Sequence, residues 1–118
     1  MNTIVKNINP TEVLSLSGLV EYADGQVVSR TLAQNKSLSL TYFAFDQGEE
    51  ISAHASSGDA LVYVLDGSSQ VTIGDEVFTV NAGETILMPA GVPHALYAIE
   101  RFKMQLVVVF PPAPVVNF

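Results

Sequence analysis

Several residue types are absent or scarce in this sequence, and each absence removes a class of function. The 118 residues include no cysteine. The chain therefore has no disulfide, no thiolate metal ligand and no cysteine nucleophile. The longest apolar run, around residues 106–110, is far shorter than the ~20 residues that a membrane-spanning helix needs. We expect no membrane-spanning segment.

Basic residues are scarce as well. Five Lys and Arg against twelve Asp and Glu give a net charge of −7. Because neutralisation of phosphates by Lys and Arg dominates nucleic-acid affinity, this balance argues against DNA, RNA or anionic membranes as partners. Residues 1–10 show no apolar run resembling a secretory signal, so the expected location is the cytoplasm.

Apolar residues are abundant, at 48% of the chain, whereas charged residues make up only 14%. A chain of this length and composition is expected to bury a core as a single domain. Its apolar fraction and its positive mean hydropathy are higher than a small monomer needs. Because large exposed apolar patches usually mark association sites, we expect an oligomer, most simply a homodimer.

The dominant pattern along the chain has a period of two residues, which predicts strands. In residues 37–45 one face carries Leu38, Leu40, Tyr42 and Ala44, and the other carries Ser39, Thr41, Phe43 and Phe45, so both faces are expected to be covered. Further strands are expected within 61–65, 70–73, 76–80, 84–89, 94–100 and 104–110. The dipeptides Asp66-Gly67 and Gly74-Asp75 are typical of hairpin turns. Many short strands with turn residues between them predict an antiparallel sandwich or barrel.

The two ends of the chain are less regular. Asn9 followed by Pro10 and Glu12 resembles a helix start, but residues 13–22 fit an edge strand equally well. The proline-rich residues 111–118 cannot join a central strand and are expected to lie over the surface or over a partner. The expected organisation is one domain over 1–118, with a barrel core at about 26–110, an N-terminal arm at 1–25 and a tail at 111–118.

Two glycine-led segments resemble the two conserved motifs of the cupin superfamily. At the spacing of the first motif stand Gly48, His54 and Gly67, and at the spacing of the second stand Gly83, Pro89, Gly91 and His94. The resemblance covers about residues 26–110. It implies an all-β fold, an antiparallel jelly-roll β-barrel whose mouth is a natural small-ligand pocket, and subunits that commonly dimerise.

The departures from the family pattern concern the metal site. The resemblance implies three histidines and one glutamate, but Ser56 replaces the second histidine, Ala60 replaces the glutamate, and Ala98 replaces a terminal asparagine. The ligands that remain are His54 and His94. Catalytic zinc or iron usually has three protein ligands, so a tight site is not favoured. If a divalent metal (Zn, Fe, Mn or Ni) binds, these two histidines are its expected ligands.

Asp59 lies next to the missing glutamate position, but strand alternation turns it to the opposite face unless a bulge intervenes. A catalytic triad of Ser56 or Ser57 with a histidine and Asp59 is not favoured, because nothing resembles a nucleophile elbow.

The function expected from these residues is small-molecule binding in a largely apolar pocket. Its expected lining is His54, Ser56, Tyr63, His94, Leu96 and Met104. The ordinary alternatives are a hydrogen-bonded interior histidine pair and core packing of the large apolar side chains. The alternative function is a metal-dependent dioxygenase or isomerase with a reduced ligand set. A metal-free isomerase with a histidine base would need an acid such as Tyr63 or Tyr97 within reach. The sequence leaves open whether the protein is an enzyme.

Overall fold

The computed structural model describes residues 4–112, and within them the fold is almost entirely β. The only helical element in that part of the chain is the short 3-10 helix η1 (Leu16–Leu19). The strands are β1 (Val27–Gln34), β2 (Leu38–Phe45), β3 (Glu50–His54), β4 (Asp59–Asp66), β5 (Ser68–Ile73), β6 (Glu76–Asn81), β7 (Thr85–Met88), β8 (His94–Tyr97) and β9 (Phe102–Val109). No described helix is long and apolar enough to cross a membrane.

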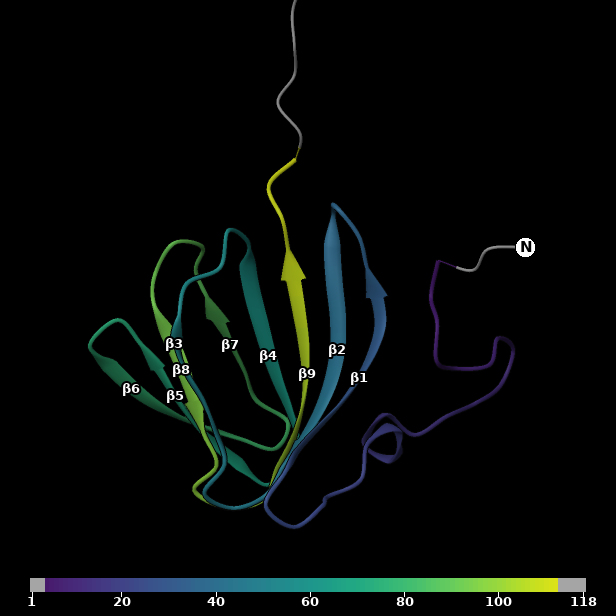
Figure 1. Cartoon of the computed structure of the whole chain (residues 1–118), viewed down its shortest axis with the longest axis horizontal. Helices are drawn as coiled ribbons and strands as arrows, with labels where there is room; N and C mark the ends of the chain where they lie inside the picture. The colour runs from purple at the N-terminus through teal and green to yellow at the C-terminus, as the bar shows by residue number, and fades with distance from the viewer. Residues whose placement is uncertain (1–3, 113–118) are drawn as a thin grey trace, which may run out of the picture.

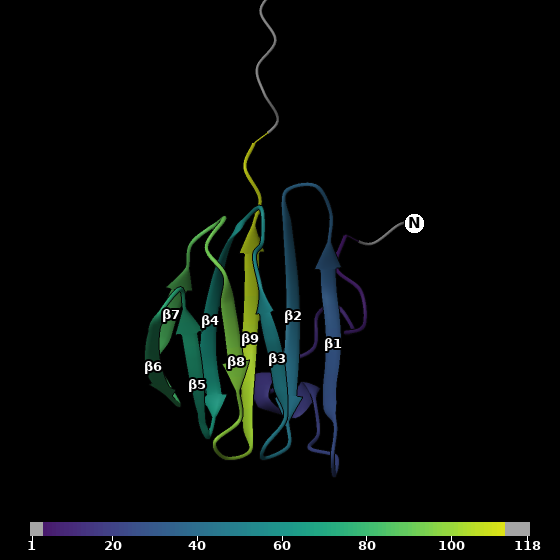
Figure 2. The ribbon, with the colours of Figure 1, turned by 60° about the vertical axis from the view of Figure 1, so that its left-hand side comes forward.

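The strands form two antiparallel sheets that face each other (Figures 1 and 2). One sheet has the order β1-β2-β9-β4-β7 and the other the order β3-β8-β5-β6. The sheets converge at one end and splay at the other, where the β3–β4 and β7–β8 loops lie (Figure 1). This arrangement confirms the expected all-β, antiparallel jelly-roll barrel.

The space between the sheets is filled by apolar side chains. Its fully or almost fully buried members include Phe45, Val62, Val64, Val71, Met88, Leu96, Ala98, Phe102 and Met104. The rings of Phe45 and Phe102 stack with their centroids 4.4 Å apart. Each large buried side chain contributes about 1.5 to 3 kcal/mol, so this cluster is the main source of stability.

Strand β2 is covered on both faces, as its sequence indicated. Phe45 points between the sheets, whereas Tyr42 and Ala44 point outward and are also buried. The outward pair packs against Leu19 and Val20 of the N-terminal arm, which forms a second cluster on that face.

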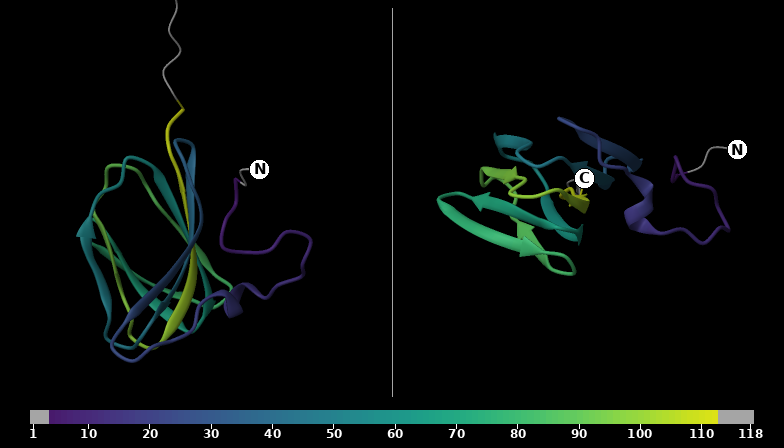
Figure 3. Two further views of the ribbon diagram at one scale, coloured as in Figure 1. Left: turned by 45° about the vertical axis from the view of Figure 1, so that its right-hand side comes forward. Right: turned by 90° about the horizontal axis from the view of Figure 1, so that it is seen from below.

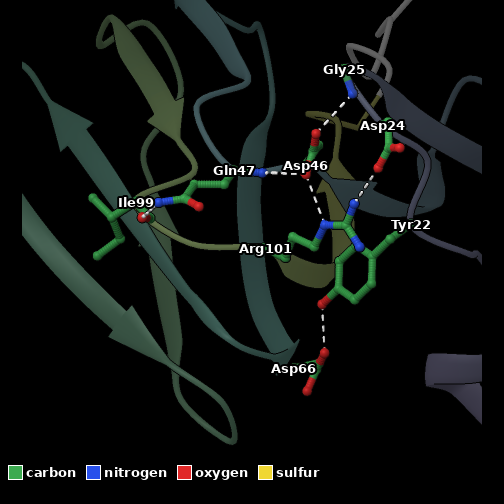
Figure 4. Close-up of polar contacts among 8 residues, drawn as sticks. All are labelled: Tyr22, Asp24, Gly25, Asp46, Gln47, Asp66, Ile99 and Arg101. Atoms are coloured by element: carbon green, nitrogen blue, oxygen red, sulfur yellow. Dashed lines mark hydrogen bonds and ion pairs between the residues drawn. The ribbon is translucent and has the colours of Figure 1, made fainter.

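A set of polar contacts holds the arm to the barrel (Figure 4). Arg101 pairs with Asp24 of the arm at 2.7 Å and with Asp46, just after β2, at 2.8 Å. The carboxylate of Asp46 also accepts the Gly25 N–H, and these two interactions lower its pKa. The hydroxyl of Tyr22 donates to Asp66, and burial together with this bond raises the pKa of Tyr22. The arm is thus tied to three segments that are distant in sequence.

The turn predictions had different outcomes. Gly74 and Asp75 join β5 to β6 as a two-residue hairpin, with Ile73 and Glu76 paired. Only the glycine has a positive φ, which fits a type II′ turn. Asp66-Gly67 is not a hairpin turn, because β4 and β5 belong to different sheets. Gly67 instead lets the chain cross from one sheet to the other.

The arm differs from both alternatives offered by the sequence. Residues 10 and 11 form a turn and η1 follows, so neither an α-helix nor an edge strand forms. Asn9 uses its amide to bond Glu12 rather than to cap a helix. The arm returns along β1 (Figures 1 and 3), where the Lys6 N–H donates to the Leu32 carbonyl at 2.7 Å. Most of the proline-rich tail, residues 113–118, lies outside the described residues.

Candidate functional site

The two histidines of the chain meet on neighbouring strands. His54 is the last residue of β3 and His94 the first of β8, and their Cα atoms are register partners. Their ring centroids are 4.5 Å apart and the rings meet edge to face, with an interplanar angle of 68°. Residues forty positions apart in sequence therefore form one contact, where β3 ends and β8 begins.

An irregularity in β3 aims His54 at its partner. The register passes from Ile51 opposite Leu96 to His54 opposite His94, so β3 uses one more residue than β8 between the two pairs. In regular alternation Ile51 and His54, three positions apart, would face opposite sides of the sheet. The extra residue is a β-bulge, which restores His54 to the inner face.

The surroundings of the two imidazoles define their tautomers. The Nδ1 of His54 lies 3.1 Å from the Ser52 carbonyl, and the Nδ1 of His94 lies 3.3 Å from the Val92 carbonyl. A carbonyl only accepts, so each Nδ1 carries the proton and donates it. In the neutral form each Nε2 is then an acceptor.

The two rings differ in exposure. His94 is 4% exposed, whereas His54 is exposed to solvent. Burial, together with the neighbouring His54, lowers the pKa of His94. At neutral pH His94 is therefore uncharged and presents a lone pair on Nε2.

Of the other expected pocket residues, Leu96 and Met104 lie in the core, Ser56 lies in the β3–β4 loop and Tyr63 faces outward. Leu96 and Met104 are buried in the core between the sheets, on the same side as His94. The Ser56 hydroxyl accepts the Gly58 N–H at 3.1 Å, and its carbonyl accepts the Gly91 N–H at 2.8 Å. Ser56 thus ties the β3–β4 loop to the β7–β8 loop.

Tyr63 lies on the wrong face for a pocket residue. It is 37% exposed and sits between the buried Val62 and Val64, so its side chain points out of the barrel. Tyr97, 39% exposed, likewise alternates with buried neighbours on β8. Strand alternation therefore separates both tyrosines from the histidines, so neither lies where a metal-free isomerase would need its acid.

The residues present do not fit the metal centre that the cupin motifs imply. Among residues 4–112 no group of three or more His, Cys, Asp or Glu side chains could hold a metal ion. Ala60, at the glutamate position, is buried in the core. Asp59 faces the other way and accepts the Ala90 N–H at 2.8 Å. Two imidazoles are one ligand short of an ordinary catalytic site.

A groove near His94, lined by mostly apolar residues together with Asp75 and Glu76, was not anticipated from the sequence. Its volume is about 590 Å³, and its lining includes Ile73, Phe78, Ile86, Pro89 and Val92. Ile73 is the register partner of His94 on β5, and Val92 supplies the carbonyl that holds the His94 ring.

Comparisons with known proteins agree with this geometry. A family model described as the cupin domain matches residues 41–110. A conserved protein of unknown function from Streptococcus pyogenes is 47% identical, with a TM-score of 0.92, and the match covers 95% of this chain and 98% of that one. A cupin superfamily protein from Desulfitobacterium hafniense is 30% identical, with a TM-score of 0.86 and coverage of 91% and 98%. An uncharacterised protein from Streptomyces coelicolor is 30% identical over 79 residues, or 67% of this chain and 75% of its own. The fold, the motif spacing and these similarities together show that the chain belongs to the cupin superfamily.

Proposed function

We propose that this cupin binds a small, mostly apolar organic molecule beside His54 and His94. The observation that carries the proposal is the contact between the two imidazoles, each with its Nδ1 against a backbone carbonyl, so that each Nε2 is an acceptor in the neutral form. A small-molecule site usually combines an apolar lining with a few polar groups that fix orientation. Here the polar groups are the two imidazoles, and the groove that begins at Ile73 and Val92 supplies apolar surface.

The chemistry of the pair limits the ligand class. A neutral His94 accepts a hydrogen bond, so the ligand should offer a hydroxyl or N–H donor. The net charge of −7 disfavours an anionic ligand, because the field of the whole protein repels it. An uncharged hydroxylated ring compound has both required properties.

No enzymatic function is proposed. The donor set does not fit a metal centre, and both candidate acids, Tyr63 and Tyr97, face outward. A histidine base without an acid partner or a metal has no structural support for an isomerase or dioxygenase reaction.

Selective nitrogen-15 labelling of histidine provides the test, because only two residues contribute signals. Phenol, which has a donor and an apolar ring, should shift the Nε2 signal of His94 and raise the melting temperature. Toluene, which lacks the donor, should produce a smaller Nε2 shift. The stabilisation by phenol should disappear in His94→Gln and persist in Thr72→Ala, on the outward face of the neighbouring strand. Unmoved histidine signals in the presence of phenol would contradict the proposal.

The same protein tests the metal-dependent alternative. After dialysis of untagged protein we expect sub-stoichiometric zinc, iron, manganese and nickel by elemental analysis, because two imidazoles bind metal weakly. Stoichiometric metal that is lost in both His54→Ala and His94→Ala would favour a metal centre over the proposed function.

A further inference from the structure

The outward face of the four-stranded sheet carries a hollow of about 340 Å³. The residues that line it come from β3, β5 and β8 and are Glu50, Gln70, Thr72, Ala95, Leu96 and Tyr97. Ile51, Val71 and Leu96 pack in the core, so their neighbours along each strand point outward. The hollow therefore lies on the opposite face of the sheet from the His94 imidazole.

Strand register places three of these side chains in one row across the hollow. Tyr97 is the register partner of Glu50 on one side and of Gln70 on the other. Neighbouring strands are about 4.8 Å apart, so the backbones of β3 and β5 stand roughly 10 Å apart with Tyr97 between them. Ala95, two positions before Tyr97 on the same face, has only a methyl group, and its register partner Thr72 adds a hydroxyl. A flat group lying on the Tyr97 ring thus has Glu50 on one side and Gln70 on the other.

The charge on this side of the molecule is negative. Strands β3, β5, β6 and β8 contain Glu50 and Glu76 but no Lys or Arg. Glu49, directly before β3, and Asp75, in the turn after β5, add further negative charge. All five basic residues belong to the arm, to β1 or β9, or to segments that adjoin these strands: Lys6, Arg30, Lys36, Arg101 and Lys103. Because β1 and the arm lie across the molecule from β5 and β6 (Figure 1), the field of the protein attracts cations to the four-stranded sheet.

The lining groups themselves select a cation with several N–H donors. Both ion pairs among the described residues are made by Arg101, so within residues 4–112 the exposed Glu50 has no cationic partner. A carboxylate only accepts hydrogen bonds, and the Gln70 carbonyl and the Thr72 hydroxyl add further acceptors. The aromatic ring of Tyr97 has a negative face, which attracts a cation. An anion, in contrast, would be repelled by Glu50.

We propose that this hollow binds a small guanidinium compound that stacks on Tyr97, pairs with Glu50 and donates to Gln70. A guanidinium is planar, so it can lie on a ring, and its fork of N–H donors binds a carboxylate through two parallel hydrogen bonds. It is also more weakly hydrated than an ammonium, so a shallow site desolvates it at lower cost. A quaternary ammonium has no N–H donor and would leave the acceptors of Gln70 and Thr72 unused. The volume is near the lower end of the roughly 300 to 1,000 Å³ of small-molecule sites, which limits the ligand to a small compound.

Amide NMR titrations of the full chain test the proposal, at low ionic strength because salt screens exposed charges. Butylguanidinium should shift the amide signals of Gln70 and Tyr97. It should bind at least about tenfold more tightly than butylurea, which has a similar planar shape but no charge. Butylammonium, a cation without the planar fork, should bind more weakly than butylguanidinium. Equal affinities for butylguanidinium and butylurea would overturn the proposal, and equal or tighter binding of butylammonium would refute the choice of a guanidinium.

Three variants, whose amide spectra also report whether each is folded, locate the binding site. Glu50→Gln should weaken butylguanidinium binding at least about tenfold, and Tyr97→Leu about threefold or more. Glu76→Gln is the matched control, because it changes the net charge equally but pairs with Ile73, which packs toward the core on the other face of the sheet. It should change the affinity by less than about twofold. An equal loss in Glu76→Gln would show that the overall field, rather than the hollow, attracts the ligand.

Phenol separates this site from the one proposed beside the histidines. Because the two sites lie on opposite faces of the sheet, saturating phenol should leave the dissociation constant of butylguanidinium unchanged. Competition between the two compounds would refute a separate site on the outward face.

Discussion

Gly67 is the residue at which the chain passes from one sheet to the other, and its geometry excludes a side chain. It has a φ of +72°, and a Cβ there would lie 2.0 Å from the Arg101 carbonyl oxygen. Gly83 has a φ of +87° with nothing within 4 Å of the same position. The two glycines share the left-handed backbone and differ in the space around them.

Substitution of the two glycines should separate backbone strain from steric exclusion. Gly83→Ala should cost about 1 kcal/mol, the penalty of the left-handed conformation. Gly67→Ala should cost at least about 3 kcal/mol more, because backbone atoms must move to admit the methyl group. Urea unfolding measures both losses of stability. Equal losses of stability in the two variants would show that the steric contact with the Arg101 carbonyl adds nothing to the cost of backbone strain.

The lowered pKa of His94 makes stability depend on pH. Between the folded-state pKa and the ordinary value of 6.5, the unfolded chain binds more protons than the folded one, so stability rises with pH. The contribution is complete above 6.5 and is lost as the pH falls through the folded-state pKa. The titratable side chain that contacts His94 is His54.

The free energy of unfolding should therefore fall between about pH 7 and pH 5, by at most about 1.4 kcal/mol per pH unit for one proton. His94→Gln should flatten the profile in this range, whereas the exposed His54→Gln should flatten it less. Urea unfolding at several pH values measures the effect. A profile that is unchanged in His94→Gln would contradict this assignment.

At the scale of elements, the contact between arm and barrel depends on Tyr22. Its hydroxyl donates to Asp66, and Arg101 and Lys103 lie over its ring at 5.4 and 5.0 Å. Tyr22→Phe keeps the ring and removes only the hydrogen bond. Its expected cost is about 1 kcal/mol.

Limited proteolysis should detect the loosened arm in Tyr22→Phe as faster cleavage between residues 4 and 20, with the barrel intact. Glu21→Gln, a change at an exposed neighbour, is the matched control and should leave the rate unchanged. Equal cleavage rates in wild type and Tyr22→Phe would show that the hydrogen bond does not hold the arm.

The elements could be predicted from sequence wherever side chains alternate regularly. Strands β2, β4, β5, β6, β7 and β9 coincide with predicted runs, and the run at 94–100 contains β8. Strand β1 was not recognised, because an irregularity between Thr31 and Ala33 interrupts its alternation. Strand β3 was not recognised either, because Ile51 is its only large apolar residue.

The candidate site was predictable only in part, because its geometry depends on strand register and on how the strands meet. Motif spacing indicated that His54 and His94 belong together, but only the register shows the bulge that aligns them. The side on which Tyr63 lies follows from the burial of its neighbours in the folded sheet. The groove beside Ile73 depends on how β5, β6 and β7 meet, which no local pattern encodes.

For the molecule as a whole, the pairing of distant strands should make folding slow. Strand β9 pairs with β2 on one side and with β4 on the other, so the larger sheet closes only through contacts between distant residues. Proteins dominated by such pairings fold in roughly milliseconds to seconds. Stopped-flow refolding from urea should show a main phase in this range. A main phase of microseconds would mean that local structure limits folding.

The central place of β9 also has a consequence during synthesis. Residues 46–101 are translated after β2 is complete and before β9 begins, which takes roughly 3 to 11 seconds at 5 to 20 residues per second. Throughout that interval β2 lacks the strand that separates it from β4 in the finished sheet, and β4 lacks the same strand from its own completion at Asp66 onward, so their backbone N–H and C=O groups stay available to other nascent chains. The crowded polysome is thus the setting in which this protein is most open to misassembly, and a chaperone that shields strand edges would act there first.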